Sequence, residues 1–210
     1  MKISMLDRVL LLLTGLLAAY QVAVGINGLG NIPMIAYTVA FGVLLVAGLL
    51  IIILGFEILD SPVVVIVSTI IPLSLSLGLV WEHMENWRGL YLGYEIVGFL
   101  AILLTRSFSM PGPVLKPGLP RKLPTIILAF VHGIAGLIIF LLPSILAANG
   151  TMKPGFALVG LGGALIGIGG LLLSFLKAGK PILPKETILR ILPGLLLLMT
   201  VAFVTGFSIG

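Results

Sequence analysis

The amino-acid sequence predicts an all-α integral membrane protein with seven transmembrane helices. Of its 210 residues, 60% are hydrophobic and 9% are charged, against about 25% charged residues in an ordinary water-soluble domain. Such a chain cannot cover its surface with polar groups, so its solvent must be lipid. Seven apolar stretches are each long enough to cross the roughly 30 Å hydrocarbon core of a bilayer, and the basic residues gather on one side of them.

The seven stretches are separated by short breaks that are polar or rich in proline and glycine. We expect helices, with boundaries accurate to about three residues, at Arg8 to Ile26, Ile32 to Phe56, Pro62 to Glu82, Trp87 to Thr105, Pro124 to Ala148, Gly155 to Leu176 and Thr187 to Ser208. The first stretch also has features of a signal peptide that would end at Ala18-Ala19. Gln21 and the internal repeat favour a membrane helix instead.

The basic residues predict the orientation of the chain. Two of the twelve, Arg88 and Lys153, fall on one face of the seven-helix topology. The other face carries Lys2, Arg8, Arg106, Lys116, Arg121, Lys122, Lys177, Lys180, Lys185 and Arg190. Because positively charged loops stay in the cytoplasm, we expect the N-terminus inside and Gly210 outside a prokaryotic-type plasma membrane.

A spacing of 121 residues recurs along the chain and predicts an internal repeat. The matched residues are Pro33 with Pro154, Gly42 with Gly163, Gly48 with Gly169 and Pro72 with Pro193, and Asn27-Gly28 matches Asn149-Gly150 at a spacing of 122. We therefore expect one three-helix repeat at 1–86, a linking helix and loop at 87–123, and a second repeat at 124–210. The alternative is that glycine and proline are simply abundant in membrane helices.

One linking helix returns the second repeat in the same orientation as the first. This three-plus-one-plus-three order resembles, in topology, the sugar transporters called SWEETs. The Pro-Gln pair of the related PQ-loop proteins is absent from the sequence. The resemblance implies two parallel repeats related by an axis along the membrane normal, and it favours transport as the function.

The segment Ser107 to Lys122 holds four prolines and three basic residues and predicts an extended cytoplasmic linker. Its basic side chains are expected near anionic headgroups, each contributing on the order of 1 kcal/mol. The alternative is a loop that only sets the topology. On the sixth expected helix, Gly160, Gly163, Gly167 and Gly170 predict a smooth stripe for close helix packing.

Two ionisable residues, Glu95 and His132, are expected inside the hydrocarbon. Groups at that depth are costly, from about 2.5 kcal/mol upward, and normally face the protein interior or a water-filled path. Each lies eight residues past the start of its helix, and the two helices run in opposite directions. At 1.5 Å per residue their depths differ by about 6 Å, so the two side chains can meet if their helices face each other.

Further polar residues are expected between Glu95 and the outer surface. Helical spacing places Arg88, Tyr91, Glu95 and Phe99 on one face, with Tyr94 beside Glu95. Other helices contribute Gln21, Ser74, Ser76 and Thr200 to the same outer half. We expect either that these groups line an outward-opening polar cavity, or that they form hydrogen bonds that only hold the helices together.

A weak candidate metal site lies between Trp81 and Trp87. Glu82, His83 and Glu85 carry side chains that bind metal ions. Three ligands in one turn, with no second histidine nearby, are a poor metal site. A loop anchored at the headgroups by the two tryptophans is therefore the favoured interpretation, and no metal or other cofactor is expected.

Catalysis and nucleic-acid binding are not expected. The chain has no cysteine, which excludes disulfides and thiolate chemistry, and no phosphate-binding loop, Gly-x-Ser-x-Gly elbow or His-Glu-x-x-His motif occurs. Two functions remain. The first is a small transporter or channel that is proton-coupled through Glu95. Its expected substrate path is lined by Glu95, His132, Gln21, Tyr91, Arg88, Ser74 and Tyr94. The alternative is a structural or assembly subunit of a larger membrane complex. The expected partners are lipids, with anionic headgroups at the cytoplasmic face, and either a second copy or a larger complex.

Overall fold

The structure is a computed structural model that describes residues 3–26, 28–107, 123–177 and 180–210, without the side chains of Asp60 and Lys177. The expected linker at 108–122 lies outside the described residues, as do Lys2, Asn27, Lys116, Arg121 and Lys122. Within the described ranges the secondary structure is entirely helical. Seven helices there are long and apolar enough to cross a membrane, which confirms the expected multi-pass class.

The seven long helices begin and end within about three residues of their expected boundaries. They are α1 (Met5–Val24), α2 (Asn31–Leu54), α3 (Pro62–His83), α4 (Arg88–Ser107), α5 (Leu123–Ala148), α6 (Ala157–Lys177) and α7 (Lys185–Ile209). Short 3-10 turns occur at η1 (Phe56–Asp60), η2 (Glu85–Trp87) and η3 (Pro154–Phe156).

Local signals explain where α1 starts and stops. The Ser4 hydroxyl accepts a hydrogen bond from the Asp7 backbone N–H at 3.1 Å, and the Ser4 N–H donates to the Asp7 carboxylate at 2.9 Å. This capping box gives hydrogen-bond partners to two backbone N–H groups, those of Ser4 and Asp7, at the helix start. The helix ends at Gly25, whose φ of 68° is accessible to glycine at little cost.

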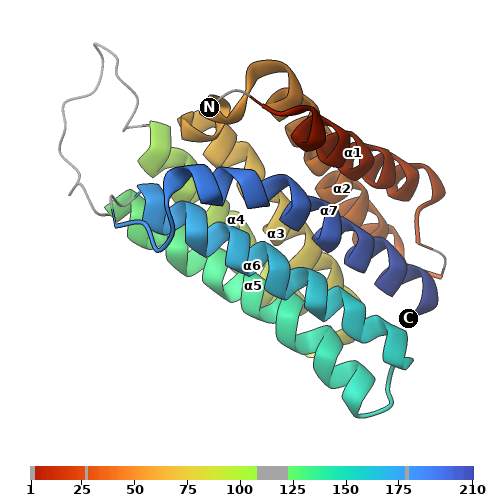
Figure 1. The fold of residues 1–210 in the computed structure, drawn as a ribbon. Helices are drawn as coiled ribbons and strands as arrows, with labels where there is room; N and C mark the ends of the chain where they lie inside the picture. Colours follow the sequence, from red (N-terminus) through yellow and green to blue (C-terminus); the bar gives the residue numbers. More distant parts are fainter. Residues whose placement is uncertain (1–2, 27, 108–122, 178–179) are drawn as a thin grey trace.

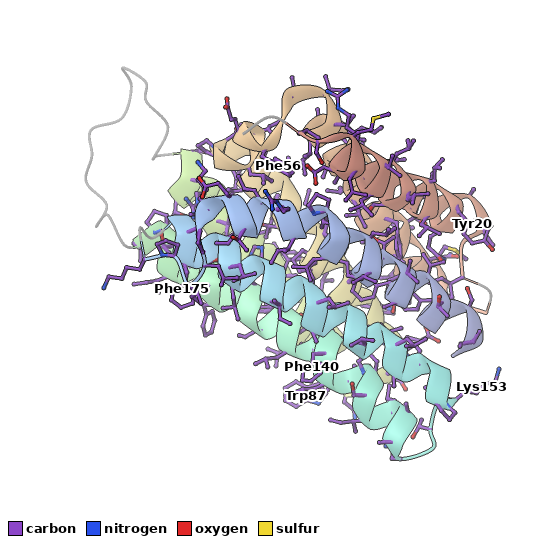
Figure 2. All side chains as sticks on the ribbon, in the orientation of Figure 1. Tyr20, Phe56, Trp87, Phe140, Lys153 and Phe175 are labelled. Atoms are coloured by element: carbon purple, nitrogen blue, oxygen red, sulfur yellow. The ribbon has the colours of Figure 1, made fainter. Side chains whose placement is uncertain are left out.

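Six of the helices form a closed ring in the order α1, α2, α3, α5, α6, α7, in which each helix packs against the next and α7 packs against α1. The remaining helix, α4, packs against α3 and α5 from outside the ring (Figure 1). The two termini lie at opposite ends of the bundle (Figure 1). Lys153 lies at the end that carries the C-terminus, and Phe175 lies toward the opposite end (Figure 2).

The interior of the ring is apolar and aromatic. Its main buried cluster draws residues from all six ring helices and none from α4. The Phe207 ring lies 4.7 Å from the Tyr37 ring and 6.4 Å from the Phe41 ring, measured between centroids. A hollow lined by Phe41, Met199 and Phe203, among others, has no space for a water-sized molecule.

Several glycines allow helices to approach closely. A Cβ atom on Gly160 would lie 2.7 Å from the Phe140 carbonyl oxygen, and one on Gly163 would lie 2.9 Å from the Ile139 carbonyl carbon. These two glycines confirm the close packing expected for α6, which occurs against α5. The other two expected members, Gly167 and Gly170, have no such neighbour within 4 Å.

Candidate functional site

The intramembrane acid Glu95 lies on α4 and faces α3. Its side chain is 7% exposed, and its Oε1 atom lies within hydrogen-bond distance, 3.2 Å, of the fully buried Ser76 hydroxyl. The same hydroxyl lies 2.6 Å from the Pro72 carbonyl oxygen and 2.9 Å from that of Leu73. The carboxyl is thus enclosed between two helices and contacts a hydroxyl that also serves its own helix.

Two tyrosines adjoin this contact. Tyr91 lies one turn before Glu95, and its buried hydroxyl lies near the Ser76 hydroxyl but makes no hydrogen bond of ordinary length with a described residue. Its ring lies 5.3 Å from the Tyr94 ring. The Tyr94 hydroxyl donates a 2.9 Å hydrogen bond to the Val131 carbonyl on α5. One polar contact therefore joins α4 to α3 and another joins it to α5.

Arg88, the outermost of the four residues expected on one face of α4, contacts the turn between α3 and α4. Its Nε donates to the Trp81 carbonyl at 2.6 Å, its Nη1 lies 3.3 Å from Glu85 Oε1, and its guanidinium sits 5.8 Å from the centre of the Trp81 ring. Phe99, at the other end of the same helix face, packs against the apolar cluster shared by α3, α4 and α5.

The other expected path residues lie apart from Glu95. Gln21 is on α1, which does not pack against α4, and its Nε2 donates to the Gly25 carbonyl at 2.7 Å. Ser74 is half-buried. The fully buried Thr200 on α7 donates to the Leu196 carbonyl of its own helix at 2.7 Å. The structure therefore brings together Tyr91, Tyr94 and Glu95, and not the wider set.

His132 is half-buried, with its Nδ1 3.1 Å from the Leu128 carbonyl oxygen one turn earlier on α5. No hydrogen bond joins it to Glu95 in the described part of the chain. Arg106, in the last turn of α4, has a buried Nε without a hydrogen-bond partner there. Glu95 and His132 thus have different neighbours, since Glu95 contacts Ser76 on α3 whereas His132 contacts a carbonyl of its own helix.

The weak metal candidates point to different neighbours. The His83 ring contacts the Phe156 ring at 5.4 Å between centroids, whereas Glu85 pairs with Arg88 at the surface. Across the residues that the structure describes, no group of three or more His, Asp or Glu side chains is placed to hold a metal ion.

Sequence reasoning named Ser76 only as one of several polar residues and preferred Ser74 as the path residue. The two positions differ by 200° around a helix, so the rotation of α3 decides which of them meets α4. The Tyr94 contact with the Val131 backbone carbonyl had no signal in the sequence.

Comparisons with known proteins do not add a relative. No protein-family model matches the chain, and neither curated proteins nor solved structures provide a match. The function is therefore proposed from the side-chain contacts and burial described above.

Proposed function

We propose that this chain is a non-enzymatic structural or assembly subunit of a larger membrane complex in a prokaryotic-type plasma membrane. The observation that carries the proposal is the burial of Glu95 against Ser76 at the junction of α3 and α4. The acid that would mark a transport path is used in a contact between helices. Hydrogen bonds of this kind hold membrane helices together.

The distances around Ser76 support a structural role. Its hydroxyl has one hydrogen, and the Pro72 carbonyl at 2.6 Å is its nearest acceptor. A protonated Glu95 can donate its own O–H to Ser76 Oγ while Ser76 donates to Pro72. This arrangement satisfies both side chains and places no net charge in the hydrocarbon, where charge is costly.

The outer face of α4 supports association with another transmembrane helix. Residues one or two turns apart on this face are all exposed, namely Gly89, Gly93, Val97, Leu100 and Leu104. A Cβ atom on Gly89 or Gly93 would meet nothing within 4 Å, so a partner helix can approach the backbone closely. Small residues four apart are typical of such helix contacts.

The basic end of the bundle supports lipid contacts. Lys180, Lys185 and Arg190 are exposed at the beginning of α7 or just before it. We place this end, with the N-terminus, at the cytoplasmic face, where anionic headgroups attract such residues by about 1 kcal/mol each. Gly210 then lies outside.

Native mass spectrometry of the chain purified in mild detergent tests the subunit proposal. We expect a complex of fixed stoichiometry that dissociates when Gly93→Leu fills the open face of α4. Gly133→Leu is the matched control, because Gly133 on α5 is also exposed with nothing within 4 Å of its Cβ position. A monomer in every mild detergent, or equal loss in both variants, would contradict the proposal.

A transporter or channel with two parallel repeats is the second candidate, and matched backbone features favour it. Gly28 and Gly150, which are 122 positions apart, both have positive φ, 83° and 76°. Pro72 and Pro193 both lie inside their helices. The packing of α1 on α2 and of α2 on α3 has its counterpart in α5 on α6 and α6 on α7. Pro143, inside α5, has no match in α1.

In that second candidate, Glu95 would be the proton-carrying group of an occluded conformation. The chain in proteoliposomes that contain a pH-sensitive dye would then carry protons when a membrane potential is applied. Glu95→Gln would abolish this flux without unfolding the protein, because glutamine keeps the shape but cannot ionise. Absence of flux in the unsubstituted protein would leave the subunit as the better candidate.

A further inference from the structure

A small hollow lies where α1 ends and α2 begins. It is lined by Gln21, Gly25, Ile26, Met34, Tyr37 and Thr38. Gln21 is 6% exposed, and the hydrogen bond from its Nε2 to the Gly25 carbonyl fixes which way the amide faces. Its Oε1 is therefore turned inward, where it has no hydrogen-bond partner among the described residues.

A buried carbonyl oxygen without a donor is unfavourable, so this amide points to a missing donor. We propose that Gln21 is the central residue of a binding site for a primary ammonium group. Such a site is compatible with both a complex subunit and a transporter.

The surroundings of Gln21 favour a donor that is positively charged. The last turn of α1 holds no basic residue, so nothing on this helix offsets the partial negative charge of its C-terminus. Thr38 adds a hydroxyl that can accept a hydrogen bond. No Lys or Arg lines the hollow.

The site lies at the membrane boundary, because Gln21 is three residues before the end of α1, or about 4.5 Å along the helix axis. Lipid headgroups occupy this level. Tyr20 and Val24, on the same end of α1, are exposed and apolar enough to contact an acyl chain. An ethanolamine headgroup or a free amine can each supply the ammonium group.

Met34 closes the hollow. Its sulfur lies 3.2 Å from the position that a Cβ on Gly25 would take, and no water-sized space remains inside. Methionine side chains are flexible and adapt to irregular spaces, so we expect ligand binding to require Met34 to move to another rotamer. Gly25, with its φ of 68°, allows the chain to turn directly after α1, next to the hollow.

The test measures lipid binding to the purified full chain by native mass spectrometry. Phosphatidylethanolamine is compared with phosphatidylglycerol of the same acyl chains and with phosphatidylcholine, whose ammonium group has no N–H. We expect phosphatidylethanolamine to bind in preference to both. Gln21→Leu should weaken this binding by about tenfold or more, because a hydrogen bond to a charged group is lost.

Thr14→Val is the matched control, because Thr14 is a fully buried polar residue two turns earlier on α1 that donates to its own Leu10 carbonyl. It should leave the lipid preference unchanged. A thermal-shift titration with ethylammonium distinguishes the sources. Stabilisation that depends on Gln21 assigns the site to free amines as well, and its absence, with the lipid preference intact, assigns it to the headgroup. Equal binding of the three lipids, or a preference that survives Gln21→Leu, overturns the proposal.

Discussion

The Tyr37 ring on α2 lies directly against the backbone of Gly78 on α3. A Cβ atom on Gly78 would stand 2.5 Å from two atoms of that ring, well inside ordinary van der Waals contact. Tyr37 is itself 4% exposed and packs against Phe207 of α7. Tyr37 therefore joins α2 to both α3 and α7, and its ring fits against α3 because residue 78 has no side chain.

Gly78→Ala should destabilise the protein. The added methyl group must displace a buried ring, and overpacking of this kind typically costs about 1–3 kcal/mol. Thermal unfolding in detergent measures the effect. Gly42→Ala is the control, since a Cβ there meets nothing within 4 Å, and an alanine in a helix interior is more favourable than glycine by about 0.5–1 kcal/mol. Equal melting temperatures for the two variants would show that the contact between Tyr37 and Gly78 is looser than described.

Glu95→Gln should change stability little. The glutamine amide can donate to Ser76 Oγ much as a protonated carboxyl does, and hydrogen bonds between membrane helices average about 0.6 kcal/mol. Thermal unfolding checks this against Glu57→Gln, which alters an exposed acid in η1. A large loss of stability in Glu95→Gln alone would mean that Glu95 is ionised and paired in the folded protein.

The absence of native cysteine allows a direct test of how α4 packs on α5. A Cβ on Gly98 would lie 3.8 Å from Val131 Cβ, which is about the mean separation in a disulfide. The double variant Gly98→Cys with Val131→Cys should therefore cross-link on mild oxidation, as seen by a mobility shift that reductant reverses. Gly93→Cys with Val131→Cys should not cross-link, because Gly93 faces outward. Cross-linking of the second pair and not the first would place α4 in another rotation.

The proposed orientation predicts the position of reporters fused to the chain. A reporter after Gly210 should behave as extracytoplasmic, and one after Lys180, in the basic connection before α7, should behave as cytoplasmic. Alkaline phosphatase and green fluorescent protein report the two sides separately. A cytoplasmic signal after Gly210 would contradict the orientation and the placement of the exposed basic end at anionic headgroups.

The sequence by itself determined the class of the protein, the seven helices and nearly all their ends. These follow from local chemistry, because about 20 apolar residues must form a helix in lipid and because Pro62 favours the first turn of a helix. The caps Ser4 and Gly25 place the ends of α1 at Met5 and Val24, where the apolar pattern had predicted Arg8 and Ile26. The positions of Glu95 and His132 along their helices followed in the same way, and their depth in the membrane stays a prediction from the rise per residue.

Only the tertiary structure decided what the polar side chains meet. The depth of a side chain depends on its position along its helix. The direction in which the side chain points depends on how the helix is rotated, and its contacts depend on which helices adjoin it. Packing between segments distant in the sequence sets the rotation and the neighbours. This is why Ser76 and not Ser74 contacts Glu95, and why Gln21 turns its amide back to Gly25 on the far side of the ring. The place of α4 outside the ring, against α3 and α5, has the same origin, because lipid solvates apolar helix faces without favouring one arrangement of them.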